Sequence, residues 1–200
     1  MKFGGTSVAN LSRIKNLQQL VKNKISNGHK KILVVVSAMS GVTNNLVKQY
    51  KKIDSNINKP EYDVILSTGE QYSSAIISTF LNKNGLKSRS ILGWQIPIIT
   101  DDKFSQARIE KINTEKILKL FKKFNVLVVA GFQGISSEDR ITTLGRGGSD
   151  TSAVAIAVAL KSKICEIYTD VEGIFSSDPR VVKDAKKIEN ITYEEILEMA

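Results

Sequence analysis

The sequence predicts an α/β fold, a three-layer α/β/α sandwich with a mainly parallel central sheet, and three observations support this prediction. Short apolar runs rich in β-branched residues, such as Ile32–Val36 and Val126–Ala130, are typical of strands buried on both faces of a parallel sheet. Longer segments between these runs repeat their apolar residues at helical spacing. The two signals alternate along the chain, as they do when helices cover both faces of a sheet.

The individual elements follow from the same patterns. Apolar residues recur at helical spacing from Leu11 to Ile25, and Gly28 then provides a stop signal. A stretch of small and apolar residues from Thr151 to Leu160 indicates a later helix. In chain order the predicted elements are helix 11–25, strand 32–36, helix 72–81, strand 88–92, helix 112–124, strand 126–130, helix 151–160 and strand 164–169.

Length and composition predict one globular domain. The 200 residues suffice for one well-buried core, and no linker or internal repeat suggests a second. Hydrophobic residues make up 42% and charged residues 24%, an ordinary balance for a folded protein. No window reaches the roughly 18 consecutive apolar residues of a membrane helix. Cys165 is the only cysteine, which excludes an internal disulfide and fits a reducing, cytoplasmic location.

The net charge of +9 raises the possibility of nucleic-acid binding. The basic residues, however, are mostly lysines spread over helical segments, without interleaved aromatics and without a nucleic-acid motif. We therefore interpret the charge as solvated surface, with a smaller local contribution to holding anions, and expect no nucleic-acid or membrane partner.

Polar and glycine residues follow three of the predicted strands, where ligands gather in parallel α/β sheets. Ser37 follows strand 32–36, Gly131 follows strand 126–130, and Asp170 follows strand 164–169. We expect the functional site at this edge of the sheet.

The segment from Lys2 to Ser7 contains two adjacent glycines, Gly4 and Gly5. Glycines let backbone N–H groups approach phosphate oxygens, and Lys2 supplies a positive charge. The spacing differs from that of a Walker P-loop. Taken alone, a Gly-Gly pair after a strand is more often a simple tight turn.

A second glycine-rich segment, Gly145 to Asp150, opens the predicted helix 151–160. Free N–H groups and the positive end of the helix dipole make such a turn an anion site, and Arg146 adds a fork suited to a carboxylate or phosphate. Ser149 or Asp150 could simply cap the helix. Capping alone does not explain an arginine flanked by three glycines, so we favour the functional interpretation.

Together these segments resemble the amino-acid kinase family and, within it, the aspartate kinases. The resemblance spans essentially the whole chain, with seven motifs in the family's order. They are KFGGTSVAN at 2–10, VVVSAMSGVTN at 34–44, STGEQYSS at 67–74, GWQIP at 93–97, AGFQG at 130–134, TTLGRGGSDTSA at 142–153 and YTDVEGIFSSDPRVV at 168–182. Without the resemblance, the last segment would be only a loop that could border a nucleotide.

The resemblance implies transfer of a phosphoryl group from ATP, with Mg²⁺, to the side-chain carboxylate of L-aspartate. The product would be 4-phospho-L-aspartate, which feeds lysine, threonine, methionine and diaminopimelate biosynthesis. The implied catalytic residues are Lys2 and Asp150. The implied ATP-binding residues are Lys2, Phe3, Gly4, Gly5, Thr169, Asp170, Phe175 and Arg180. The implied aspartate-binding residues are Ser37, Thr43, Glu70, Arg146, Gly147, Gly148 and Ser149, with no resident metal site.

The chemistry agrees with this assignment. The attacking carboxylate has an ordinary pKa near 3.9 and is already ionised at neutral pH, so no general base is needed. That suits a chain whose one histidine, His29, lies in a polar stretch that we expect to be exposed. Bringing two anions together instead requires positive charge and positioning.

The resemblance also implies that residues 1–200 form a catalytic domain incomplete at its first strand and its C-terminal end. Only Met1 precedes Lys2, so either Lys2 is weakly anchored or the first strand extends upstream. Paired regulatory ACT domains and a homodimer are expected of the full-length enzyme. Two alternatives remain open: an amino-acid kinase that makes a different acyl phosphate, and a nucleotide-binding remnant without activity.

Overall fold

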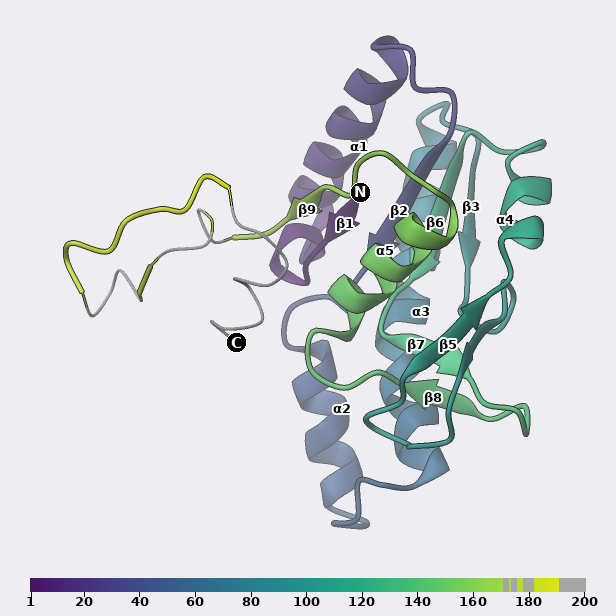
Figure 1. Cartoon of the computed structure of the whole chain (residues 1–200), viewed down its shortest axis with the longest axis vertical. Coiled ribbons are helices and arrows are strands. Elements are labelled where there is room, and N and C mark those ends of the chain that lie inside the picture. The colour runs from purple at the N-terminus through teal and green to yellow at the C-terminus, as the bar shows by residue number, and fades with distance from the viewer. Residues whose placement is uncertain (171–172, 174–175, 178–181, 191–200) are drawn as a thin grey trace. The chain divides into compact units, whose positions relative to one another are not determined.

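The computed structural model describes residues 1–170, 173, 176–177 and 182–190. The chain divides into two compact units, Met1–Thr169 and Asp170–Ala200. The first unit carries the helices and strands described below (Figure 1). In the second unit, the backbone N–H of Lys186 donates a hydrogen bond to Ser176 Oγ. Within the described part of the chain, no helix is long and apolar enough to cross a membrane.

The central sheet has five strands in the order β3-β6-β2-β1-β9, and every neighbouring pair is parallel. This confirms the predicted α/β fold with a mainly parallel central sheet. The strands are β1 (Lys2–Phe3), β2 (Ile32–Val36), β3 (Ser88–Ile91), β6 (Val126–Ala130) and β9 (Ile167–Tyr168). The predicted strands 32–36 and 126–130 have the expected bounds. Of the predicted strand 164–169, only the two residues of β9 form a strand.

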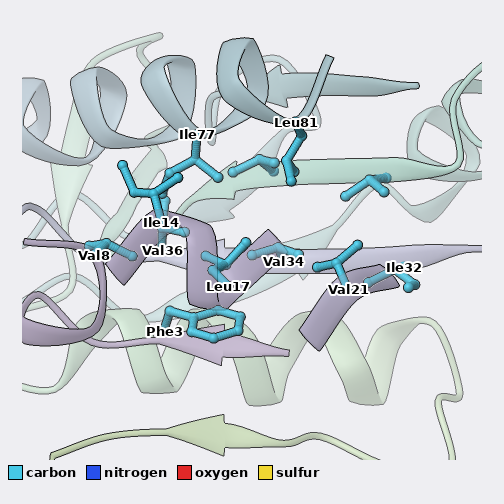
Figure 2. Close-up of a cluster of buried hydrophobic side chains, with 12 residues drawn as sticks. Phe3, Val8, Ile14, Leu17, Val21, Ile32, Val34, Val36, Ile77 and Leu81 are labelled. Atoms are coloured by element: carbon cyan, nitrogen blue, oxygen red, sulfur yellow. The ribbon is translucent and has the colours of Figure 1, made fainter. Parts of the chain in front are cut away.

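Alternate residues of β2 point into different cores, which is why its sequence is apolar throughout. Ile32, Val34 and Val36 pack with α1 (Leu11–Ser26) and α3 (Pro60–Lys83), as Figure 2 shows. Val35 packs on the opposite face with α4 (Thr114–Leu120) and α5 (Gly148–Ala159). Helices therefore cover both faces of the sheet, giving the three layers predicted.

Lys2 lies on the central sheet between β2 and β9. It is in register with Val35 on one side and Ile167 on the other, and its exposure is only 6%. The backbone N–H of Lys2 also donates to the carbonyl of Glu166 at 2.7 Å. Lys2 is thus firmly held, contrary to the weak-anchoring alternative.

A second, smaller sheet was not predicted. Its order is β5-β4-β7-β8, with one parallel pair, β4 and β7, between two antiparallel pairs. Its strands are β4 (Ile98–Thr100), β5 (Ile109–Ile112), β7 (Gln133–Ile135) and β8 (Ile141–Thr143). Strands this short leave almost no periodicity in the sequence, which explains why they were missed.

Three predicted helices have different bounds in the structure. The predicted start of helix 112–124 was wrong, because Ile112 is the last residue of β5. Asn113 caps α4, and its side chain accepts a hydrogen bond from the N–H of Lys116. Helix 72–81 is the second half of α3, and helix 151–160 begins earlier, at Gly148. Two further helices, η1 (Thr6–Val8) and α2 (Val42–Lys51), were not predicted.

Candidate active site

A cavity of about 650 Å³ opens where β2 and β6 end and α5 begins. Its walls come from the segment after β2, from α2 and α3, and from the glycine-rich segment before α5. All seven predicted aspartate-binding residues line it: Ser37, Thr43, Glu70, Arg146, Gly147, Gly148 and Ser149. The cavity also takes in Asp150, so residues spread over more than half of the chain meet in one place.

The two predicted catalytic residues form an ion pair. Lys2 Nζ lies 2.8 Å from Asp150 Oδ1, and the side chains are 8% and 44% exposed. No well-aligned hydrogen bond from the described residues reaches that oxygen, so the contact is one of charge. Lys2 comes from β1 and Asp150 from the first turn of α5. The pair therefore joins the central sheet to the cavity wall.

Gly5 is required by close packing. A Cβ on Gly5 would lie 2.6 Å from the carbonyl oxygen of Ala38, whose backbone cannot easily yield. The Gly5 carbonyl also accepts a hydrogen bond from the N–H of Ser40 at 3.2 Å. The turn after β1 is thus pressed against the segment that follows β2.

The segment before α5 has an unusual backbone that only glycine adopts freely. Gly145 and Gly147 have φ angles of 75° and 70°, in the left-handed region. A Cβ on Gly148 would lie 2.7 Å from the Phe132 ring, so that ring packs directly on the start of α5. These constraints turn the chain sharply between β8 and α5 and leave Arg146 exposed at the cavity.

Glu70 is a buried carboxylate, and only one of its oxygens has a hydrogen-bond partner in the described part of the chain. It is 3% exposed, and its Oε1 accepts a hydrogen bond from the N–H of Ala38 at 3.0 Å. Its Oε2 is buried and has no hydrogen-bond partner among the described residues. Burial raises the pKa of Glu70 to about 7, partly opposed by the hydrogen bond from Ala38. Such an oxygen is suited to accept from a cationic ligand group that enters the cavity.

The predicted ATP-binding residues lie in different places. Gly4 donates its N–H to the carbonyl of Tyr168 at 3.2 Å, so the turn after β1 lies beside the end of β9, which Thr169 follows. The Phe3 side chain is in the hydrophobic core, stacked on Tyr168 with ring centroids 4.6 Å apart. Any contact of Phe3 with a nucleotide would therefore be through its backbone. Asp170 is exposed in the second unit, and Phe175 and Arg180 lie outside the described residues.

Asp150 is the carboxylate of the cavity that would help to hold a magnesium ion carried by a nucleotide. Within the described part of the chain, no three His, Cys, Asp or Glu side chains cluster closely enough to hold a metal ion. Asp150 is partly exposed and could provide a single carboxylate. One or two protein carboxylates plus substrate phosphates is the usual coordination of Mg²⁺ in phosphoryl-transfer enzymes, so the residues fit an ion carried by ATP.

Sequence reasoning missed several residues around the cavity. Ala38 supplies the N–H that holds Glu70, and Phe132 forms a wall although its φ of 69° is rare for a non-glycine residue. Asp63 lies behind the cavity, fully buried on α3. Its signal was available, because Pro60 followed by acidic residues marks a helix start. A helix begun there would have put Asp63 and Glu70 on one face.

Comparison with known proteins agrees with this geometry. The family model described as "Amino acid kinase family" matches residues 1–200. The chain belongs to the amino acid kinase family. It is 48% identical over 202 residues to an aspartokinase of Rickettsia felis and 49% identical over 199 residues to one of Bacillus sp. strain MGA3. Each match covers 100% of this chain but only 50% and 48% of the relative. This amino acid kinase chain thus spans about half the length of the curated relatives it matches.

Solved structures of two aspartate kinases are similar to this chain. Aspartokinase III of E. coli, in complex with aspartate and ADP, matches with a TM-score of 0.85 and 29% identity, covering 100% of this chain and 55% of that one. Aspartate kinase from Synechocystis matches with a TM-score of 0.82 and 45% identity, covering 99% and 32%. An isopentenyl phosphate kinase, at 16% identity and a TM-score of 0.67, shares the fold alone.

Proposed function

We propose that the protein is an aspartate kinase, which transfers the γ-phosphoryl group of ATP to the side-chain carboxylate of L-aspartate. The observation that carries the proposal is the cavity itself. It combines the buried carboxylate of Glu70, one oxygen of which has no hydrogen-bond partner among the described residues, with the exposed guanidinium of Arg146. It also contains Asp150, a carboxylate paired to a buried lysine. Aspartate has one ammonium group, which a carboxylate such as Glu70 can bind, and two carboxylates, one of which a guanidinium such as Arg146 can bind.

The amino group of aspartate binds at Glu70 and a carboxylate binds at Arg146. An ammonium group would give Oε2 of Glu70 the partner that it lacks among the described residues, and would favour the ionised form of that side chain. The guanidinium of Arg146 offers two parallel donors to a carboxylate. The hydroxyl groups of Ser37, Thr43 and Ser149 and the backbone of Gly147 and Gly148 complete the aspartate site.

The phosphoryl group is held at Lys2, Gly4 and Gly5. Lys2 neutralises charge on the transferring group, the two glycines cradle its oxygens, and Asp150 orients Lys2. Mg²⁺, carried by the ATP phosphates, supplies further positive charge when it is bound. The ion pair fixes the Lys2 ammonium before any substrate enters, which lowers the cost of organising the site.

The reaction needs no proton transfer. An oxygen of the aspartate side-chain carboxylate forms a bond to the γ-phosphorus, and the bond from that phosphorus to the β,γ-bridging oxygen breaks. The bridging oxygen leaves with the electron pair as part of ADP. Because the nucleophile is already ionised at neutral pH, catalysis consists of positioning and charge neutralisation. His29 is exposed and has no part in this scheme.

The nucleotide contacts Thr169, Asp170, Phe175 and Arg180, together with the backbone of Phe3. The support for these positions is the resemblance of segment 168–182 to the family. We also propose that residues 1–200 form an amino-acid kinase catalytic domain within a longer, homodimeric enzyme with regulatory domains. Its product would supply lysine, threonine and methionine biosynthesis.

The deciding experiment traps the acyl phosphate with hydroxylamine. The protein produced from its complete gene is incubated with ATP and Mg²⁺, and with aspartate, glutamate or N-acetylglutamate in turn. We expect a hydroxamate from aspartate only. Hydroxamate from another acid would identify a different amino-acid kinase. Nucleotide binding without turnover of any acid would identify an inactive remnant.

A further inference from the structure

Asp63 is a fully buried carboxylate that accepts hydrogen bonds from two separate segments. Its exposure is 0%. The N–H of Ser105 donates to both carboxylate oxygens at 3.0 Å, the N–H of Thr143 donates to Oδ2 at 2.6 Å, and the Thr143 hydroxyl donates to Oδ1 at 2.9 Å. All three donors are neutral, so a single buried acidic group is balanced by backbone and hydroxyl dipoles. Burial raises the pKa of Asp63, against the effect of these bonds.

The Thr143 contact lies at the base of the segment that carries Arg146. Thr143 is the last residue of β8, and only Leu144 and Gly145 separate it from Arg146. The N–H of Leu144 donates to the carbonyl of Phe132 at 2.9 Å, so the chain is fixed at two successive residues before the left-handed turn at Gly145.

The Ser105 contact supports the same segment from the other side. Ser105 has a φ of 68°, a strained value for this residue, so its conformation depends on contacts such as the one with Asp63. Its carbonyl oxygen lies 3.1 Å from where a Cβ of Gly145 would be. The N–H of Ala107 also donates to the Thr143 carbonyl at 2.9 Å. Residues 105–107 thus form a support behind the Arg146 segment.

Asp63 also connects this support to Glu70. The two residues are seven positions apart on α3, which places them on one face of the helix about two turns apart. Ser105, Thr143 and Glu70 all line the cavity, whereas Asp63 stands behind it. One carboxylate therefore joins the helix that carries Glu70 to the segment that carries Arg146.

We infer that Asp63 is a positioning residue for aspartate: it sets the spacing between Glu70 and Arg146 by fixing Thr143 and Ser105 to α3. The inference rests on the proposed function for its substrate. It differs from a purely structural role because it predicts a selective effect. Loss of the carboxylate should weaken binding of aspartate, which needs both walls of the cavity, and leave ATP almost unaffected.

The kinetic test uses Asp63→Asn in the full-length enzyme. Asparagine keeps the shape and one acceptor oxygen but replaces charge-assisted hydrogen bonds by weaker neutral ones. We expect the KM for aspartate to rise about tenfold and the KM for ATP to change less than twofold. Asp63→Ala removes all four bonds and should shift the KM for aspartate further if that variant folds.

The matched control is Ile117→Ala, which destabilises the fold without touching the cavity. Ile117 is fully buried on α4, in the core on the other face of the sheet, and this truncation lowers the melting temperature by leaving a cavity there. Its KM for aspartate should stay within twofold of the wild type. Equal kinetic changes in Ile117→Ala and Asp63→Asn, or a rise in both KM values of Asp63→Asn, would overturn the inference.

Hydrogen exchange of the ligand-free protein tests the same inference without relying on activity. In Asp63→Asn the amides of Ser105 and of 143–148 should exchange at least about tenfold faster, relative to the amides of β6, than in the wild type or in Ile117→Ala. Unchanged relative exchange would refute the positioning role even if aspartate proved not to be the substrate. Faster exchange in an enzyme that does not act on aspartate would sustain the positioning role and reject the proposed function.

Discussion

Lys2 and Asp150 hold a buried positive charge in a fixed place without any ligand. Lys2 is almost fully buried, yet its ammonium is 2.8 Å from a carboxylate that is 44% exposed. The desolvation of the lysine is thereby compensated, while the partly exposed partner remains accessible to a ligand. In the proposed mechanism, this arrangement places a fixed positive charge where two anions must meet.

Replacing Lys2 by methionine tests that role. We expect kcat to fall at least about 100-fold with little change in the KM for aspartate, because the charge acts on the transferring phosphoryl group. The control is Lys24→Met, which removes a lysine from an ion pair with Glu166 in the same unit but away from the cavity. Initial rates at saturating aspartate measure both variants. A Lys2→Met enzyme with normal kcat would remove Lys2 from the mechanism.

Glu70 predicts a specific dependence of stability on pH. Its pKa is raised from 4.5 to about 7 in the folded protein, so the folded state binds more protons than the unfolded state between these values. Stability from this group is therefore present below pH 4.5 and is lost as pH rises to 7. Glu70→Gln removes the buried charge and should not show that loss.

The melting temperature of Glu70→Gln, measured without aspartate from pH 5 to pH 8, should rise relative to the wild type across this window. The shift in pKa corresponds to at most about 3 kcal/mol, or several degrees for a chain of this size. The same variant should lose aspartate binding. A difference in melting temperature that is constant with pH would show that Glu70 does not titrate in this range.

At the scale of elements, the sequence predicted the buried framework and missed its polar parts. The strands 32–36 and 126–130 were predicted correctly because both faces of each strand are covered, so every residue is apolar. Helix α3 was only half predicted. Its buried face carries Asp63, Ser67 and Glu70, polar residues that interrupt the apolar periodicity.

The site was predictable from sequence only through resemblance. Periodicity placed Ser37 and the glycine-rich segment at strand and helix ends, which is where the structure has them. It could not place Glu70 in the same cavity, because that requires knowing how α3 packs against the sheet. The hydrogen bonds of Asp63 join residues 42 and 80 positions apart, and no local pattern encodes such contacts.

The glycine-rich segment before α5 offers a matched pair of substitutions. Gly147 and Gly28 have φ angles of 70° and 92°, and a Cβ on either would have nothing within 4 Å. Gly147→Ala and Gly28→Ala should therefore each cost about 1 kcal/mol of backbone strain without a steric clash. Only Gly147→Ala should also raise the KM for aspartate, by about threefold or more, because the strain falls beside Arg146. Thermal unfolding and steady-state kinetics measure both. An equal effect of Gly147→Ala and Gly28→Ala on the KM for aspartate would mean that the conformation of the segment has no specific role in aspartate binding.

At the scale of the whole molecule, the parallel sheet explains why distant motifs meet. Strands β1, β2 and β6 run in one direction, so the segments after them emerge at the same edge. Helix α5 begins at that edge and brings Asp150 to Lys2. The edge collects positive charge and glycine backbone from parts of the chain separated by more than 140 residues.

The net charge of +9 comes mainly from exposed surface lysines and not from the buried Lys2. The salt dependence of activity and of DNA binding distinguishes the two kinds of charge. Lys15 and Lys22 are exposed on α1, and Lys116 and Lys119 are exposed on α4, which covers the opposite face of the sheet. These lysines form no single stripe for a nucleic acid to follow, and exposed charges are screened beyond about 10 Å at 0.1 M salt. The buried Lys2 is screened much less.

We expect kcat to change less than about twofold between 50 and 500 mM KCl, and duplex DNA to bind with a Kd weaker than about 10 μM at 150 mM KCl. Submicromolar DNA binding that weakens steeply with salt would instead assign the charge to a nucleic-acid partner.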